Sequence, residues 1–379
     1  MVLKILHISD DPLPDWRVEK SALTLKKDNN MVFFAGKEPS SNYYRKTFDK
    51  IFTLNWTPKA RYQIPYDWYK IKRQINDILL EVQPDIIHAH NILSARLIQE
   101  IKEYPFVYDN HEYWSKYLLI SNEKSAESKL QKGFNPKNVF KSNMEKLLKK
   151  ASTKRWINWE LDLVSKIPTL VPSKPIANEL LKIGKKIYVL PNFPMKNENY
   201  NICDPKMIDH FSSVYAGTMP YKGYQTPFKN IDGFIPLFKK FDIGTLNIIG
   251  WKSENSKNVI YHGLLDRDKM LDEMSNNSIG LIPFIQHPFH QYMSPNKAYE
   301  YAHAGLLILS TNSIKPIFDE LKDNVIGFND YDELIENLKY FKTMPEELLN
   351  RRTKTSDYAK KYIIWERHEQ SIYESYKQA

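Results

Sequence analysis

Short apolar runs alternate with helical patterns along almost the whole chain. This alternation predicts a parallel sheet that helices cover on both faces, and therefore an α/β fold. In the first half, the runs that fit strands are residues 3–9, 31–35, 51–54, 85–90, 106–109, 169–171 and 188–190. A helical pattern at residues 68–82 places its apolar side chains on a single stripe.

A polar stretch that begins at Pro191 and ends at Pro205 reads as a linker. Beyond it, strand-like runs return at residues 213–216, 246–249, 259–261, 279–284, 306–310 and 325–328. We therefore expect two doubly wound, Rossmann-like domains, residues 1–192 and 205–356, with only helix after them. Ligands of such folds bind beyond the carboxyl ends of the strands, so functional residues are expected there, along a cleft between the sheets.

Charge and cysteine content narrow the class of protein. The 379 residues include 54 Lys and Arg against 45 Asp and Glu, a net charge of +9, which favours an anionic partner: nucleic acid, an acidic membrane surface or a phosphorylated small molecule. The single cysteine, Cys203, excludes an internal disulfide and indicates a reducing compartment. We find neither a secretory signal nor an apolar run of the roughly eighteen residues that a spanning helix needs, so a cytoplasmic protein is expected.

Residues 294–305 carry the strongest local signal. Ser294 suits a helix N-cap, Pro295 the first helical position, and Gly305 the end of the helix. A helix N-terminus with Lys297 in its first turn is suited to bind a phosphate, and the carboxylate of Glu300 matches the two hydroxyls of a ribose. The pattern predicts a nucleoside diphosphate site. An ordinary Lys–Glu pair on an exposed helix is the alternative.

Five motifs in order resemble the family 4 retaining glycosyltransferases of the GT-B fold. They are residues 294–305, His111 with Glu112 after a strand, and residues 84–90, 189–192 and 215–218. The resemblance covers essentially the full chain. It implies that the second domain mainly binds the nucleotide sugar, that the first mainly binds the acceptor, and that a final helix, about residues 357–379, crosses back to complete the first domain.

The resemblance also implies roles for individual residues. Glu300 resembles the ribose-binding carboxylate, Lys297 would lie near the diphosphate, and Lys222 resembles the lysine that neutralises the leaving phosphate. His111 resembles the histidine that contacts the donor sugar and stabilises developing charge. The alternative for Lys222 is a solvated turn lysine, and the alternative for His111 is a histidine that bonds only to the backbone. The remaining donor-binding positions by this resemblance are Ser294, Asn296, Gly217 and Thr218.

Three positions depart from the family pattern. Tyr292 stands where many members carry a glutamate, so sugar contacts are expected from His287, His290, Gln291 or Ser294. The loop after the first strand lacks the family's glycine pair, and Arg17 is expected to replace backbone amides as a phosphate or acceptor contact. Thr218 stands where arginine is common, which leaves Lys222 and Lys297 as the principal cations.

The sequence predicts neither a metal nor a cofactor besides the donor substrate. Asp10 with Asp11, and His88 with His90, each lack a third and fourth ligand at a recognisable spacing, so turn or strand-end roles are expected. Retention of configuration is implied by the resemblance, although no side chain stands out as a covalent nucleophile.

Residues 137–155 concentrate the basic charge, with seven Lys and Arg against Glu145 alone. Apolar side chains form one helical stripe between them. Such a helix either lies on an anionic membrane at its inner face or packs into the core and leaves its lysines in water, and both interpretations stay open.

The sequence thus predicts transfer of a sugar from a nucleoside diphosphate sugar to a hydroxyl of a glycan or lipid-linked acceptor, in the synthesis of glycans, cell-surface polysaccharide or glycolipid. A nucleotide-sugar 2-epimerase of the same fold and a non-catalytic two-lobed binding protein are the alternatives. Nucleic acid is not expected as a partner, because the basic residues do not interleave with aromatic residues in a recognisable module.

Overall fold

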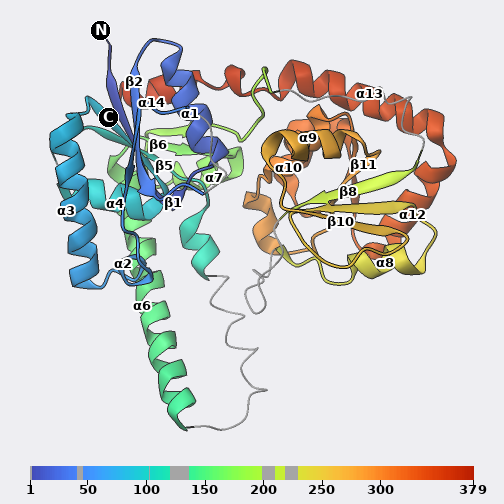
Figure 1. The fold of residues 1–379 in the computed structure, drawn as a ribbon, viewed down its shortest axis with the longest axis horizontal. Coiled ribbons are helices and arrows are strands. Elements are labelled where there is room, and N and C mark those ends of the chain that lie inside the picture. The colour runs from blue at the N-terminus through green and yellow to red at the C-terminus, as the bar shows by residue number, and fades with distance from the viewer. Residues whose placement is uncertain (1, 41–45, 102, 120–135, 199–209, 218–228) are drawn as a thin grey trace. The chain divides into compact units, whose positions relative to one another are not determined.

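The structure, a computed structural model, describes residues 2–40, 46–101, 103–119, 136–198, 210–217 and 229–379, and the side chains of all of these except 136–149. The chain divides into two compact units (Figure 1). The first unit comprises Met1–Pro191 and His368–Ala379, and the second comprises Asn192–Arg367. Each is an α/β unit built on one parallel sheet.

The sheet of the first unit has the strand order β3-β2-β1-β4-β5-β6-β7. Its strands are β1 (Lys4–Pro12), β2 (Met31–Lys37), β3 (Lys50–Thr53), β4 (Ile86–His90), β5 (Phe106–Asp109), β6 (Thr169–Val171) and β7 (Ile187–Val189). Every strand predicted for this half is present. The strand order reverses direction between β1 and β4, which makes the carboxyl ends of these two strands the place where ligands bind in doubly wound sheets.

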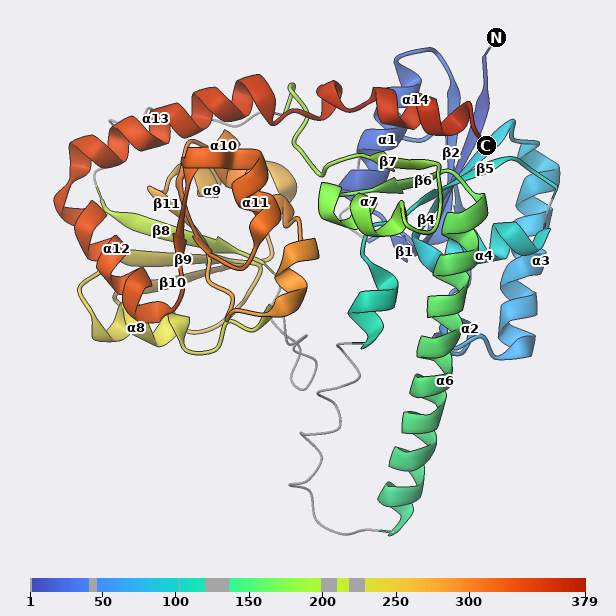
Figure 2. The same ribbon diagram turned by 180° about the vertical axis from the view of Figure 1, so that it is seen from behind.

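The helices of the first unit pack at several places around its sheet. One layer contains α3 (Pro65–Val82), α4 (Asn91–Ile101) and α6 (Pro136–Lys166), which contact one another in that order, and α6 continues past α2 (Pro58–Arg61) (Figure 2). Elsewhere α1 (Trp16–Lys26) lies beside α14 (Gln370–Tyr376), where Thr24 donates a hydrogen bond to Glu369. A shorter helix, α7 (Lys174–Leu180), contacts β6 and β7. The stripe predicted for residues 68–82 is confirmed on α3, whose buried residues are Ile71, Ile75, Ile78, Leu79 and Val82.

The sheet of the second unit has the order β10-β9-β8-β11-β12-β13, with its reversal between β8 and β11. Its strands are β8 (Ser212–Ala216), β9 (Thr245–Ile249), β10 (Val259–Gly263), β11 (Ile279–Ile282), β12 (Leu307–Thr311) and β13 (Val325–Phe328), as the sequence predicted. Its helices are α8 (Phe234–Lys240), α9 (Arg267–Ser275), η3 (Pro288–Tyr292), α10 (Asn296–His303), α11 (Lys315–Leu321), η4 (Lys322–Asn324), α12 (Tyr331–Thr343), α13 (Pro345–Tyr362) and η5 (Trp365–Arg367).

The chain returns to the first unit at its end. Residues 357–362, expected to begin the returning helix, instead continue α13 of the second unit. Trp365 is fully buried there, and its N–H donates to the carbonyl of Pro194 at 2.9 Å. The returning segment begins at His368 and contains α14. Within the described part of the chain, no helix combines the length and apolar character that crossing a membrane requires.

A buried ion pair ties α1 to the end of β5. Asp15 caps α1 by accepting from the N–H groups of Arg17 and Val18. The Arg17 side chain then donates through Nε and Nη2 to Asp109, at 3.0 and 2.7 Å, and through Nη1 to the carbonyl of Leu190 at 2.7 Å. Burial alone would raise the pKa of Asp109, but Arg17, with His111, holds that pKa well below its ordinary value. The carboxylate therefore stays ionised inside the unit.

Replacing Arg17 by Met is expected to lower the stability of the first unit by about 3–5 kcal/mol, because Asp109 would be left as a buried charge without its partner. The midpoint of thermal unfolding measures this loss, and the double variant R17M/D109N should recover part of it. Lys50→Met, which breaks an exposed pair with Glu81, is the control and should cost less than about 1 kcal/mol. Equal stability of R17M and K50M would contradict this account.

Candidate functional site

Helix α10 is held against the point where the second sheet reverses its order. The hydroxyl of Tyr301 accepts a hydrogen bond from the N–H of Ala216, the last residue of β8, at 2.8 Å. The ring of Tyr301 packs on Gly280 of β11, where any added Cβ would lie 2.4 Å from that ring. The absence of a side chain at Gly280 thus lets α10 approach β8 and β11 closely.

Lys297 lies one turn before Tyr301 and places its ammonium beside the end of β8. Its Nζ is 4.1 Å from the ring centroid of Tyr215 and 5.4 Å from that of Phe284, distances at which a cation is attracted to an aromatic ring. A Cβ on Gly217 would lie 2.9 Å from this Nζ. Gly217 therefore matters because it leaves room for the ammonium just beyond β8.

The ammonium of Lys297 has little compensation for its charge. The side chain is half-buried, and among the described residues no carboxylate lies within ion-pairing distance of it. Burial, reinforced by the like charge of Lys229 and opposed by Glu300, lowers the pKa of Lys297 to about 7. A group in this state gains most from an anion that supplies the missing counter-charge.

Glu300, one turn further along α10, is nearly buried and already has one cationic partner. Nη1 of Arg267, the first residue of α9, donates to Oε1 of Glu300 at 2.9 Å, and the same guanidinium also pairs with Glu198. Within the described part of the chain, Oε2 of Glu300 has no donor. One carboxylate oxygen, rather than the two that the sequence suggested, is thus left for a ligand hydroxyl.

The other predicted donor-binding residues are placed as follows. The predicted N-cap Ser294 is wrong by one residue, because α10 begins at Asn296 with Pro295 as its cap, and the Ser294 hydroxyl bonds that of Tyr299 at 2.8 Å. Asn296 is exposed. Lys222 and Thr218 lie outside the described residues, so their predicted roles stay predictions.

The residues around Tyr292 form hydrogen bonds within their own segment and to Ser313 after β12. His287 accepts from the N–H of Phe289, and His290 shares a hydrogen bond of 2.6 Å with the hydroxyl of Ser313. Gln291 donates to the carbonyl of Pro288 at 3.1 Å. These contacts fix the approach to α10, and the predicted sugar contacts of these residues remain a prediction.

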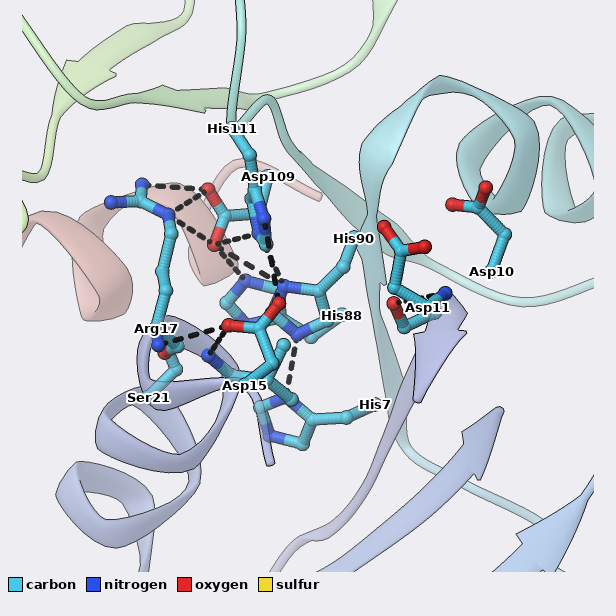
Figure 3. A network of polar contacts seen from close by, with 12 residues as sticks. His7, Asp10, Asp11, Asp15, Arg17, Ser21, His88, His90, Asp109 and His111 are labelled. Atoms are coloured by element: carbon cyan, nitrogen blue, oxygen red, sulfur yellow. Dashed lines mark hydrogen bonds and ion pairs between the residues drawn. The ribbon is translucent and has the colours of Figure 1, made fainter. Parts of the chain in front are cut away.

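In the first unit, polar side chains gather at the ends of β1, β4 and β5 (Figure 3). His111, in the loop after β5, shares a hydrogen bond of 3.1 Å between its Nε2 and Nδ1 of His90. Its ring also lies 3.6 Å from Asp109 and 3.9 Å from Asp15. Burial lowers the pKa of His111, but the carboxylates of Asp109 and Asp15 outweigh this and raise it. His111 thus lies in a place that favours its cationic form.

Arg17 and the acidic pair after β1 have structural partners. The guanidinium of Arg17 points inward to Asp109 and Leu190, as described above, and its predicted phosphate or acceptor contact remains a prediction. Arg61 donates to Asp10 at 2.6 Å and to Asp11 at 2.8 Å, in agreement with the strand-end role expected for this pair. Burial, opposed by Arg61, raises the pKa of Asp10 to about 6.

Glu160 positions the loop that carries His111. Its carboxylate is fully buried and accepts from the side-chain amide of Asn110 and from the N–H groups of Trp114 and Ser115, at 2.9–3.1 Å. Three donors stabilise the charge of this carboxylate, although burial still raises its pKa. Neither Glu160 nor Arg267 is predicted from the sequence. Asp266, an N-cap residue, marks the helix start at Arg267, but no local pattern marks Glu160.

Comparison with known proteins adds an independent finding. No family model matches the chain, and no curated protein matches it in sequence. Solved structures match it in three dimensions. A sucrose-phosphate synthase from Thermosynechococcus elongatus has a TM-score of 0.73 at 13% identity, covering 99% of this chain and 98% of that one. HepE from Anabaena, solved in complex with UDP-glucose, has a TM-score of 0.70 at 12% identity, with both chains covered at 100%.

A third solved structure has the same architecture. WaaG, a glycosyltransferase involved in lipopolysaccharide biosynthesis, matches with a TM-score of 0.61 at 13% identity, covering 97% of this chain and 98% of that one. At such identities the likeness shows the fold. Together with two parallel sheets of the predicted strand content, it establishes that this chain has the GT-B fold.

Proposed function

We propose that this protein is a glycosyltransferase that binds a nucleoside diphosphate sugar in its second unit. The observation that carries the proposal is the half-buried ammonium of Lys297, placed beside Gly217 at the strand-order reversal without a carboxylate partner among the described residues. The GT-B fold and the UDP-glucose bound to HepE support the choice of ligand. A diphosphate is the anion that suits this position.

Charge on the leaving diphosphate is the main difficulty of the reaction. Lys297 lies where it would stabilise that charge as it develops, the kind of electrostatic effect that contributes most to catalysis in many enzymes. Lys222 and the amides at the start of α10 are proposed to share this role. Oε2 of Glu300 would accept a ribose hydroxyl, while Arg267 holds Oε1 and so fixes the carboxylate. No step of this mechanism requires a metal.

The first unit is proposed to bind the acceptor and to supply His111 toward the donor sugar. There His111 is proposed to contact the donor sugar and to stabilise the charge that develops during transfer, and Glu160 fixes the loop on which it lies. Retention of configuration, a glycan or lipid-linked acceptor, and a role in cell-surface polysaccharide or glycolipid synthesis complete the proposal. They rest on the family resemblance and on the lipopolysaccharide role of WaaG.

Incubation with a panel of nucleoside diphosphate sugars and candidate acceptors tests the function. A transferase releases the nucleoside diphosphate mainly when an acceptor is present and forms a new glycoside. Acceptor-independent isomerisation of the sugar would instead establish the epimerase, and binding without turnover the two-lobed binding protein.

Glu300→Gln should lower kcat/KM for the donor at least tenfold, whereas Glu336→Gln, on the outer face of α12, should leave it unchanged. Equal kinetics of the two variants would remove Glu300 from the site.

The affinity for UDP is expected to fall as pH rises from 7.5 to 9, by up to about tenfold per unit. The reason is that unliganded Lys297, with a pKa near 7, is mostly neutral in this range, so the chain must take up a proton to present a charged ammonium to the diphosphate. An arginine at position 297 would stay protonated over this range and would need no proton uptake.

Isothermal titration of UDP against the wild-type chain and Lys297→Arg measures this dependence. The arginine variant should bind with an affinity nearly independent of pH, and Lys297→Met should bind weakly at every pH. Parallel pH profiles of the wild-type chain and the arginine variant would show that Lys297 does not face the diphosphate.

We also propose that the basic start of α6 binds an anionic membrane surface, which would bring the protein to a lipid-linked acceptor. The triple replacement of Lys146, Lys149 and Lys150 by Gln should then reduce co-flotation with vesicles of phosphatidylglycerol and phosphatidylcholine. The control removes the same charge from exposed lysines of α13, Lys354, Lys360 and Lys361. Equal flotation of the two triple variants would assign the lysines of α6 to a solvated face.

A further inference from the structure

Three potential metal ligands converge at the ends of β4 and β5 in the first unit. Nδ1 of His90 and Nε2 of His111 are 3.1 Å apart, and Oδ2 of Asp109 lies 3.4 Å from the former and 3.6 Å from the latter (Figure 3). A tetrahedral zinc ion binds such ligands at roughly 2.0–2.1 Å, which places two of its ligand atoms roughly 3.3–3.4 Å apart. The three donor atoms therefore already have the spacing of one face of such a site.

The orientation of the rings distinguishes this trio from a neighbouring one. The rings of His90 and His111 lie at 69° to each other, so the in-plane lone pairs of the two nitrogens can meet at one point. His7, His88 and His90 also bring nitrogens together, but their rings are within 19° of parallel. That trio consists of three imidazoles and contains no carboxylate, whereas the trio with His111 includes the negative charge of Asp109. Ring orientation and charge together favour the site that contains His111.

A hydrogen bond to His7 orients the imidazole of His90, and the carboxylate of Asp15 faces the other nitrogen of His111 without bonding it. Nε2 of His90 is 3.0 Å from Nδ1 of His7, so a proton on that Nε2, donated to His7, leaves Nδ1 of His90 free to coordinate. Asp15 lies 3.9 Å from Nδ1 of His111, on the side of the ring away from the trio. Metal-binding histidines usually have such partners at their other nitrogen, and these partners fix the tautomer.

The local charge and the access are also suitable for a cation. With neutral imidazoles, Asp109 and Asp15 contribute two negative charges against the single positive charge of Arg17. His90 and Asp109 are fully buried, whereas the side chain of His111 is 15% exposed. A metal ion and a water as fourth ligand would enter from the side of His111.

We propose that His90, Asp109 and His111 bind a divalent cation of the zinc class, and that this binding competes with sugar transfer. Two metal–nitrogen bonds and one metal–oxygen bond form, and the proton that His90 and His111 share in their hydrogen bond passes to the solvent. The competition rests on the proposed function, in which His111 contacts the donor sugar, because a metal-bound Nε2 is no longer available to that sugar. The binding itself does not depend on that function.

Titration of the EDTA-treated full-length chain with CoCl2 tests the site, because tetrahedral cobalt gives visible absorption bands that ZnCl2 then displaces. We expect one cobalt per chain. His90→Gln and His111→Gln should each weaken binding at least a hundredfold, and His7→Gln should weaken it about tenfold to a hundredfold through the lost orientation of His90. His111 lies in a loop, so its variant is informative even if His90→Gln fails to fold.

The matched control is His262→Gln, which removes a partly exposed histidine beside Glu273 in the second unit and should leave cobalt binding unchanged. Absence of the tetrahedral bands, or unchanged affinity in His111→Gln, would overturn the proposal. In a transfer assay, stoichiometric ZnCl2 should inhibit the wild-type chain. Because the titration detects the metal and the panel of donor sugars detects turnover, failure of this site and failure of the proposed function are separate results.

Discussion

The free-energy cost of removing a charge from water determines which partners the buried charged groups of both units need. An ionised group inside a protein is stable only if hydrogen bonds or opposite charges replace its water shell. Two buried carboxylates of the first unit have such partners. Asp109 has the guanidinium of Arg17, and Glu160 has three N–H donors. In the second unit, aromatic rings of Tyr215 and Phe284 surround Lys297, and no described carboxylate pairs with it. The lack of a described carboxylate partner is what suits Lys297 to an anionic ligand.

The order of the strands explains where these groups lie. Each sheet reverses direction once, between β1 and β4 in the first unit and between β8 and β11 in the second. At a reversal, the helices that follow the two strands lie on opposite faces, so the carboxyl ends of the strands stay accessible. His90 ends β4, and Gly217 follows β8. The charged groups of both units therefore gather where the fold leaves room for them.

The sequence was sufficient for the strands and for the position of α10, because both depend on patterns within a few residues. Burial on both faces of a parallel sheet produces continuous apolar runs, and Gly305 marks the end of the helix. The helix start was misplaced by one residue because the Ser294 hydroxyl bonds Tyr299 instead of a backbone N–H. Three contacts join residues that are far apart in the chain. Glu300 forms an ion pair with Arg267, and Glu160 accepts hydrogen bonds from the loop that carries His111. The side chains of His90 and Asp109 also lie close together. Patterns within a few residues of the sequence do not predict such contacts.

The most direct measurement is a crystal structure of the chain in complex with UDP-glucose. We expect a diphosphate oxygen within hydrogen-bond distance of Nζ of Lys297 and a ribose hydroxyl on Oε2 of Glu300, with Arg267 still on Oε1. A nucleotide bound elsewhere, or one bound near β8 that touches neither Lys297 nor Glu300, would contradict it.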